Sequence, residues 1–338
     1  MGLKLILRCA VAGLSLLTMA ACQTRIVPAP NQASTVVAAP GAAATTNAPP
    51  TNGVPRYTLR AEQTWQLNLP GGERFDASGL CLLPKGDLLT VNDVSPGLHR
   101  IQFRAGTNAA DLIRLPDCFT ATQIATFAKD KVGRWDCEGI ARDEQGRLYV
   151  CEEANRWIMR FDPRTKTLER LAIDWTPVKQ YFHPTDLNAS FEGVAVGGGK
   201  LFVANERQAG RIIVVDLKTL QVVDDFVVRP TFSFALDIHY SDLCWHDGAL
   251  YALLRESRCV LKVDPKRKAL VAEYNYDAME RAPEVAYENR YPTGTMEGLA
   301  VDRDFFWLVT DNNGRGRKKY PDDTRPTLFK CRRPDAGK

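Results

Sequence analysis

Acidic residues recur in a repeated phrase of the sequence. The phrase opens with Glu-Gly or a similar pair and ends, about ten residues later, in an acidic or amide pair; its opening acids are Glu138, Glu192, Asp242 and Glu297, and one copy has Ser78 instead. Crowded carboxylates raise one another's pKa or require a cation. Oxygen ligands suit Ca²⁺, or Mg²⁺ with retained waters. We therefore expect these four acids to bind a divalent cation. The residues that could complete the site are Asp93, Asn92, Glu153, Asn205, Glu206, Asp311 and Asn312. Alternatively, each acid caps backbone N–H groups or pairs with arginine.

Arginines follow the same strands. Candidate ligand-binding residues are Arg156, Arg207, Arg255 and Arg258. A guanidinium binds phosphate or carboxylate in a bidentate manner, so an anionic small molecule is the expected ligand. The alternative is internal Arg–Glu pairing. His183 and His239 are candidate general bases, although a single loop histidine is more often a surface residue.

Several other kinds of chemistry are not indicated. The 338 residues include nine cysteines and four histidines but no C-x-x-C or H-E-x-x-H pattern, which argues against a zinc or thioredoxin-like redox site. No G-x-S-x-G, Walker or G-x-G-x-x-G pattern occurs. The net charge is only +4, so we expect no nucleic-acid partner.

The repeated phrase occurs five times, at spacings of 60, 54, 50 and 55 residues. Each copy predicts two apolar strands joined by a tight turn. A third strand ending in Asp follows at 157–162, 211–216 and 259–264, and a fourth is exemplified by 220–228. Short antiparallel strands in groups of four are typical of β-propeller blades. The fold class is thus all-β, a five-bladed propeller, with six blades as the alternative.

The ends of the domain complete this picture. The last repeat lacks a fourth strand, and residues 62–69 precede the first repeat, so we expect them to supply it and close the ring. The only helical interruption predicted is at 120–131. In an antiparallel hairpin the start of the first strand and the end of the second share one end, so the repeated acids should gather at one mouth of the propeller.

The N-terminal segment carries targeting information. Residues 1–21 have a basic start and an apolar run from Cys9 to Ala21, which suits a signal peptide and is too short to span a bilayer. The run ends in Ala-Ala-Cys22, similar to a lipobox, so we predict lipidation of Cys22 and a lipoprotein anchored in the cell envelope, at the outer membrane facing the periplasm. The alternative is an ordinary cleavage site. Residues 22–55, rich in Ala, Pro and Thr, predict a disordered tether before a propeller domain at 56–334.

One disulfide is expected in an exported domain. Cys118 and Cys137 bracket the excursion between the first two blades, where a bridge would fix a long loop. We therefore predict a Cys118–Cys137 bond.

The Glu-Gly-aliphatic-Ala phrases, each followed by a strand ending in Glu-Glu or Asn-Glu, resemble the bacterial phytase-like propellers, the family called "esterase-like activity of phytase". The sequence is similar also to the periplasmic propellers of the SdiA-regulated family and, more distantly, to Ca²⁺-dependent lactonases of the gluconolactonase type. The resemblance implies an exported domain that binds Ca²⁺ and cleaves phosphate or carboxylic esters, with Glu138, Glu192 and Glu297 matching the family's acid. The alternatives are a non-catalytic platform for a ligand or envelope protein, and a structural envelope lipoprotein.

Overall fold

The structure is a computed structural model that describes residues 53–206, 210–231, 238–289 and 293–336. The predicted signal peptide, Cys22 and most of the tether lie outside these residues. The described part belongs to a compact unit that runs from Asn52 to the C-terminus. None of its helices has the length and hydrophobicity that crossing a bilayer would need.

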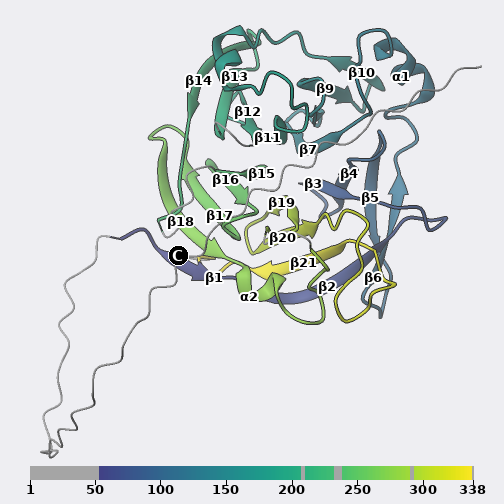
Figure 1. The fold of residues 1–338 in the computed structure, drawn as a ribbon. Helices are drawn as coiled ribbons and strands as arrows, with labels where there is room; N and C mark the ends of the chain where they lie inside the picture. Colours follow the sequence, from purple (N-terminus) through teal and green to yellow (C-terminus); the bar gives the residue numbers. More distant parts are fainter. Residues whose placement is uncertain (1–52, 207–209, 232–237, 290–292, 337–338) are drawn as a thin grey trace, which may run out of the picture. The chain divides into compact units, whose positions relative to one another are not determined.

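The strands form groups of four around a common centre (Figure 1). In chain order, four groups are β3 (Ala77–Leu82), β4 (Leu88–Asn92), β5 (Leu98–Phe103) and β6 (Ala109–Arg114); β7 (Cys137–Arg142), β8 (Leu148–Glu152), β9 (Trp157–Asp162) and β10 (Thr167–Arg170); β11 (Phe191–Gly197), β12 (Lys200–Asn205), β13 (Arg211–Asp216) and β14 (Gln221–Phe226); and β15 (Tyr240–His246), β16 (Ala249–Leu254), β17 (Cys259–Asp264) and β18 (Ala269–Asn275). The last group comprises β19 (Met296–Val301), β20 (Phe305–Thr310), β21 (Thr327–Arg332) and the N-terminal strand β2 (Ala61–Asn68).

This arrangement is a β-propeller, so the predicted all-β propeller is confirmed. The first strands of the groups contact one another in a closed cycle: β3 contacts β7, β7 contacts β11, β11 contacts β15, β15 contacts β19, and β19 contacts β3. The described residues thus provide five four-stranded groups, while the blade count of the whole ring stays a prediction.

The N-terminal strands join distant parts of the ring. β2 pairs antiparallel with β21, as expected from residues 62–69, and also pairs parallel with β6. The short strand β1 (Arg56–Thr58) adds to the outer edge of β18. The N-terminal segment therefore removes the free edges of three neighbouring groups, which stabilises the closed ring.

Hydrophobic core lies between neighbouring groups of strands. In one cluster, Tyr274 of β18 packs against Phe306 of β20 with ring centroids 4.7 Å apart, and Tyr251 of β16 contacts the same ring. These side chains come from short, mainly apolar strands whose alternate residues face the two neighbouring sheets. The core therefore fixes the angle between groups and, with it, the loops at the mouth.

The connections between groups carry the few helices. α1 (Ala121–Phe127) confirms the predicted helical interruption, and its N-cap Thr120 accepts a hydrogen bond from the Gln123 backbone N–H. A 3₁₀ helix, η1 (Thr176–Tyr181), and α2 (Asp277–Glu280) lie in two later connections and were not anticipated. Sequence periodicity does not reveal such short helices.

The predicted disulfide is not present in the structure. Cys118 and Cys137 are both free, buried thiols. They belong to the same hydrophobic cluster between the β3–β6 and β7–β10 groups, where burial raises the pKa of the Cys118 thiol to about 12. They pack there as small apolar side chains, which accounts for their burial without a bridge.

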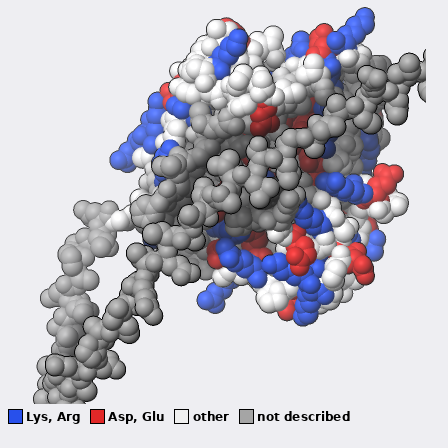
Figure 2. Space-filling view, in the orientation of Figure 1, with Lys and Arg blue, Asp and Glu red and all other residues white. Residues whose placement is uncertain are grey.

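The outer surface shows no field of a single sign on the face seen in Figure 2. Lys and Arg side chains alternate with Asp and Glu side chains around its periphery. Charged side chains of the described surface form ion pairs, such as Arg104 with Asp111 at 2.6 Å. Such exposed pairs add little to the stability of the fold. The buried charged residues are therefore the better candidates for a functional site.

Candidate metal and anion site

A β-bulge aligns the repeated glutamates. The pairing of first and second strands shifts register between Cys137 and Ile140, between Phe191 and Gly193, and between Met296 and Gly298. The extra residue of a bulge redirects a side chain locally. The residues inside these three shifts include Glu138, Glu192 and Glu297.

Asp242 occupies a different position from these glutamates. It pairs with Leu253 as Gly193 pairs with Ala204, so it stands at the glycine position and Ser241 at the glutamate position. The central strands approach so closely that a Cβ on Gly193 would lie 2.5 Å from the Asp242 Cα. Counting Asp242 as an opening acid of the repeat therefore placed it one residue away from its structural position.

The Asp242 carboxylate connects three central strands of the propeller by hydrogen bonds. It accepts backbone hydrogen bonds from Leu299 at 2.7 Å, Leu243 at 2.8 Å and Leu80 at 3.4 Å, and so links β3, β15 and β19. Its side chain is fully buried, and burial raises its pKa well above the usual range. The carboxylate groupings described below do not include it, so we do not retain Asp242 among the proposed metal ligands.

Further acids lie immediately beside the strands. Asp93, Glu153, Glu206 and Asp311 directly follow β4, β8, β12 and β20, and Asp76 and Asp136 directly precede β3 and β7. Together with the bulge glutamates they form a buried set, which we call the acidic cluster: Asp76, Asp93, Asp136, Glu138, Glu153, Glu192, Glu206, Glu297 and Asp311. Asp76 and Asp136 were missed in the sequence, although each stands two residues before the repeated Ser78 or Glu138 position.

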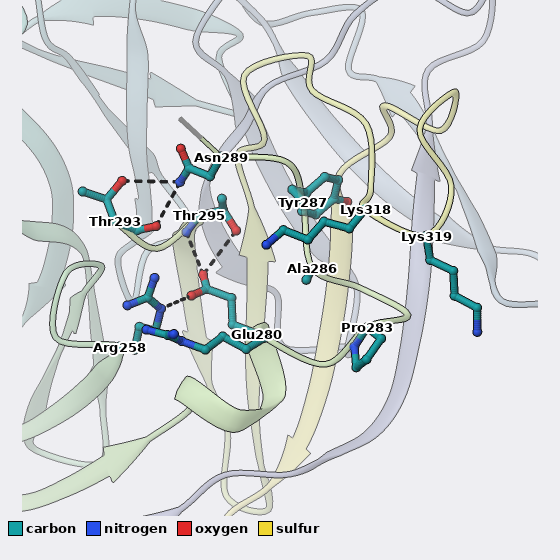
Figure 3. A pocket seen from close by; sticks show the side chains of 11 residues that line it. Arg258, Glu280, Pro283, Ala286, Tyr287, Asn289, Thr293, Thr295, Lys318 and Lys319 are labelled. Atoms are coloured by element: carbon teal, nitrogen blue, oxygen red, sulfur yellow. Dashed lines mark hydrogen bonds and ion pairs between the residues drawn. The ribbon is translucent and has the colours of Figure 1, made fainter. Parts of the chain in front are cut away.

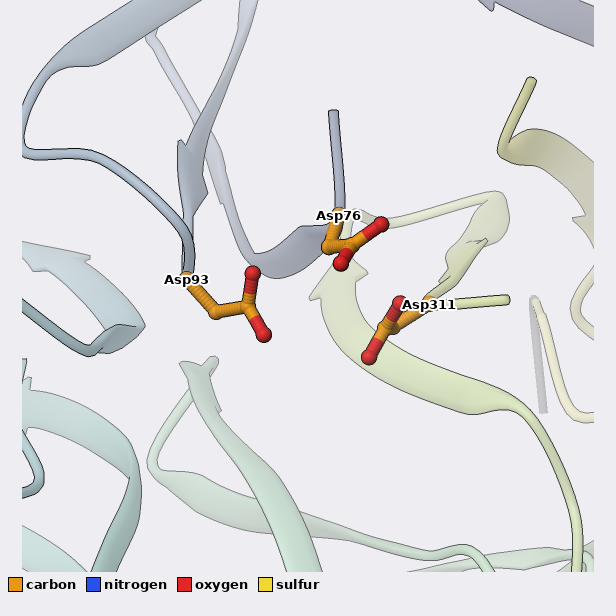
Figure 4. A group of neighbouring side chains, drawn as sticks. All are labelled: Asp76, Asp93 and Asp311. Atoms are coloured by element: carbon orange, nitrogen blue, oxygen red, sulfur yellow. The ribbon is translucent and has the colours of Figure 1, made fainter. Parts of the chain in front are cut away.

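Three groups within the acidic cluster bring carboxylate oxygens within 4.8 Å of one another. They are Asp76 with Asp93 and Asp311, Asp93 with Asp136 and Glu138, and Glu153 with Glu192 and Glu206. Figure 4 shows the first group, whose carboxyl groups come from three strand ends and face a common space. Asp93 belongs to two groups and therefore connects them.

Burial and mutual repulsion perturb the acidic cluster. Burial, followed by the charges of Asp76 and Asp136, raises the pKa of Asp93 to about 7. Burial raises the pKa of Glu297 to about 7 against the lowering effect of Arg255. For Glu138, Glu192 and Asp311, burial and neighbouring carboxylates raise the pKa well above its usual range. A bound cation would oppose these effects because it favours the ionised carboxylates.

One arginine interrupts the acidic cluster. Arg255 follows β16 at the position that Asp93, Glu153, Glu206 and Asp311 occupy in the other groups. Its guanidinium pairs with Glu206 at 2.8 Å and also with Glu297. Two buried carboxylates thus already hold the predicted ligand-binding residue Arg255, whereas Asp93 Oδ1 and Glu297 Oε2 are buried and accept no hydrogen bond from a described residue.

The other predicted basic residues make different contacts. Arg156 donates to the His183 carbonyl at 3.0 Å and lies over the Phe182 ring, and Arg258 donates to Glu280 at 2.6 Å (Figure 3). Arg207 lies outside the described residues. Arg255 and Arg258 share the turn between β16 and β17, where the Arg258 backbone N–H donates to the Arg255 carbonyl at 3.3 Å, but their guanidinium groups bind different carboxylates. Arg156 lies in another turn, between β8 and β9.

Both candidate histidines have partners within the chain. His183 Nδ1 accepts the backbone N–H of Asp186 at 2.7 Å. His239 Nδ1 lies 2.7 Å from Glu256 Oε1, next to Arg255, and this carboxylate raises the pKa of His239 against the effect of burial. Of the two, only His239 directly precedes a first strand, as Asp76 and Asp136 do.

The sequence comparison decides the family. The model of the phytase-like family, described as esterase-like activity of phytase, matches residues 51–314, which span the entire acidic cluster. The chain belongs to the phytase-like family. A search of curated proteins found no match.

Comparison with solved structures supports the propeller fold. Glutaminyl cyclase from Myxococcus xanthus is 16% identical, with 83% of this chain and 98% of that chain covered, at a TM-score of 0.55. Aldose sugar dehydrogenase from Streptomyces coelicolor is 15% identical over 81% and 98% of the two chains at 0.41, and virginiamycin B lyase from Staphylococcus aureus is 11% identical over 80% and 74% at 0.39. Of these three, the cyclase has a TM-score above 0.5, and at 16% identity its likeness supports the fold alone.

Proposed function

We propose that this phytase-like propeller is a divalent-cation-dependent hydrolase of anionic esters, phosphate or carboxylic, and that the acidic cluster holds Ca²⁺ or Mg²⁺. The observation that carries the proposal is the convergence of buried carboxylates in groups within 4.8 Å. The family description, esterase-like activity of phytase, supports the reaction class.

The donor set fits a hard cation. All its charged ligands are oxygens, and Asp93 Oδ1 is buried without a hydrogen-bond donor among the described residues. Ca²⁺ and Mg²⁺ take such ligands. We propose Asp93 as the shared ligand of two groups, with Glu138 and Glu192 as further ligands, each of which interacts electrostatically with Glu153.

The protein's own residues would prepare the site in two ways. The bulges hold Glu138 and Glu192 in fixed positions, and Arg255 fixes Glu206 and Glu297 through ion pairs. A bound divalent cation would supply Lewis acidity toward an ester oxygen and a bound water of lowered pKa. Because neighbouring strands position the ligands, the site needs little reorganisation on binding.

The test is turnover of a defined ester panel with purified protein. p-Nitrophenyl phosphate, p-nitrophenyl butyrate and inositol hexakisphosphate would be assayed with Ca²⁺, with Mg²⁺ and with EDTA. The double variant Glu138→Gln/Glu192→Gln should lose at least about 100-fold in kcat/KM, since cation ligation contributes several kcal/mol. Glu144→Gln is the matched control, because Glu144 is exposed in the turn between β7 and β8.

The alternative function is a non-catalytic platform for a ligand or an envelope protein. No turnover of any ester by the wild-type protein, with cation binding retained, would favour this alternative. Equal turnover by the double variant and the control would show that the acidic cluster is not the site.

We also propose that the domain is held at the outer membrane, facing the periplasm, by lipidated Cys22 and the 22–55 tether. The support is the short apolar run before Ala-Ala-Cys22 and the polar composition that follows. Membrane contact would then occur through the lipid anchor alone.

A further inference from the structure

A cavity of about 490 Å³, which we call the channel-end cavity, lies at the end of the first strands opposite to the acidic cluster. Its walls come from the C-terminal halves of all five first strands, β3, β7, β11, β15 and β19. On β7, Arg142 of the lining follows Glu138 of the acidic cluster by four residues, which is about 13 Å of extended strand. The cavity and the acidic cluster therefore open at different mouths of the propeller.

The centre of the propeller separates this cavity from the acidic cluster. The first strands approach closely at the glycine position of the repeat, where a Cβ on Gly79 would lie 2.6 Å from the Ile140 backbone nitrogen. The Asp242 carboxylate accepts the backbone N–H groups of Leu80 and Leu243, and both leucines line the cavity. Of the residues that the structure describes, no member of the acidic cluster lines it. A ligand in this cavity therefore needs no cation in the acidic cluster.

The lining is mainly apolar and includes Leu80, Leu82, Ile140, Val196, Leu243 and Val301. Two thiols also belong to it: burial raises the pKa of Cys81 to about 12 and raises the pKa of Cys244 as well, so both stay uncharged at neutral pH. Burial and the charge of Arg333 lower the pKa of His246, which keeps this imidazole neutral. These three titratable groups therefore add no charge to the cavity.

The acid in the lining, Asp302, is engaged in contacts within its own hairpin. Its Oδ2 accepts the Trp307 indole N–H at 3.0 Å. Its Oδ1 accepts the backbone N–H groups of Asp304 and Phe305, each at 2.7 Å. Donors of the β19–β20 hairpin thus occupy both oxygens of this carboxylate.

Arg142 is the cation of the lining, and its side chain is half-buried. It forms no ion pair or side-chain hydrogen bond with a residue in the described ranges. The acid next to it in the chain, Asp143, is held by Arg147 at 2.6 Å and by the Tyr149 hydroxyl at 3.0 Å. A guanidinium offers five N–H donors in a planar fork that matches a carboxylate. The position therefore suits a carboxylate supplied by a ligand.

We propose that the channel-end cavity binds a small aliphatic carboxylate, with the carboxylate on Arg142 and the hydrocarbon chain among the apolar side chains of the first strands. The volume lies in the range of about 300–1,000 Å³ typical of small-molecule sites. The apolar lining favours a ligand with a hydrocarbon body over a hydrated inorganic anion, because burying an ion without sufficient partners is costly. This site goes beyond the proposed hydrolase activity and does not depend on it.

The experiment is calorimetric titration of the purified protein in EDTA with acetate, butyrate and hexanoate. Hexanoate binding should be saturable, and affinity should rise about fourfold for each methylene group that is buried. 1-Hexanol has the same chain without the charge, so it should bind at least about tenfold more weakly than hexanoate. Addition of Ca²⁺ should leave the hexanoate affinity unchanged, because the acidic cluster is separate.

Two variants test the role of the guanidinium. Arg142→Gln should weaken hexanoate binding at least about tenfold and leave 1-hexanol binding unchanged, since only the carboxylate loses its partner. Arg100→Gln is the matched control, because Arg100 is exposed on β5 and does not line the cavity. It should bind hexanoate as the wild type does. Circular dichroism melts verify that both variants are folded.

Four results would overturn the assignment. They are no saturable hexanoate binding by folded wild-type protein, equal affinities for hexanoate and 1-hexanol, equal losses in Arg142→Gln and Arg100→Gln, and displacement of hexanoate by an equal concentration of inorganic phosphate, which would indicate an unspecific anion site. Hexanoate binding without turnover of any ester would support the cavity and contradict the proposed hydrolysis. Ester turnover without hexanoate binding would do the reverse.

Discussion

Replacing Asp93 by Asn should make the metal-free protein less sensitive to alkaline pH and weaken its response to Ca²⁺. Asp93 is buried, lies within 4.8 Å of carboxylates in two groups and has a pKa raised from 3.8 to about 7. An amide of the same shape removes the charge and keeps the packing. The variant therefore separates the effect of charge repulsion among the carboxylates from the effect of side-chain packing.

The magnitude follows from the pKa. Because the folded pKa exceeds the unfolded one, the stabilising contribution of the protonated carboxyl is fully present below about pH 4 and is lost as pH rises through about 7. A difference of about three pH units at about 1.4 kcal/mol each corresponds to roughly 4 kcal/mol of unfolding free energy. Wild-type protein should lose this amount between pH 4 and pH 8, in addition to losses from other carboxyls of the acidic cluster.

The assay is urea unfolding in EDTA at pH 5 and pH 8, repeated with millimolar Ca²⁺. Asp93→Asn should be more stable than the wild type at pH 8 in EDTA and gain less from Ca²⁺. Glu144→Gln serves as the control. If Asp93→Asn shows the wild-type pH dependence and the wild-type gain from Ca²⁺, the reasoning about the acidic cluster is wrong.

Three further outcomes are expected. Asp242→Ala should lower the free energy of unfolding in urea by roughly 2–5 kcal/mol because three buried N–H groups lose their acceptor. Asp242→Asn should lower it clearly less, and equal losses in the two variants would contradict the role of the Asp242 carboxylate as acceptor. Arg255→Met should destabilise the metal-free protein by about 3–5 kcal/mol because two buried carboxylates lose their cation, with a larger loss at pH 8 than at pH 5; an unchanged midpoint would refute it. Cys22→Ala should release the protein from the membrane fraction, and unchanged fractionation would exclude the anchor.

The repeats made much of the fold predictable. The third strands at 157–162, 211–216 and 259–264 appear with the same bounds as β9, β13 and β17, and residues 62–69 do complete the last group as β2. Each depends on local signals, namely apolar alternation, an Asp-initiated turn and a missing fourth strand. The helices η1 and α2 lacked such signals because they are only six and four residues long.

The candidate site was predictable in part. Glu138 and Glu192 do lie in carboxylate groups, whereas Glu297 interacts electrostatically with Glu192 but pairs with Arg255. Asp242 was counted among the opening acids by its residue type, although it stands at the glycine position of the repeat, as the register of β15 with β16 shows. Arg258 joins Glu280 of another connection, and no sequence pattern encodes that pairing.

The most direct test of the cation-binding claim is calorimetric titration of the metal-free protein with Ca²⁺ and with Mg²⁺ at pH 7, in two buffers of different ionisation enthalpy. Because the pKa values of Asp93 and Glu297 are both raised to about 7, these carboxyls are partly protonated at this pH. Binding at the acidic cluster should therefore be saturable and should release protons, giving an apparent enthalpy that differs between the buffers. Absence of saturable heat with either cation, or binding without proton release, would contradict a cation site in the acidic cluster.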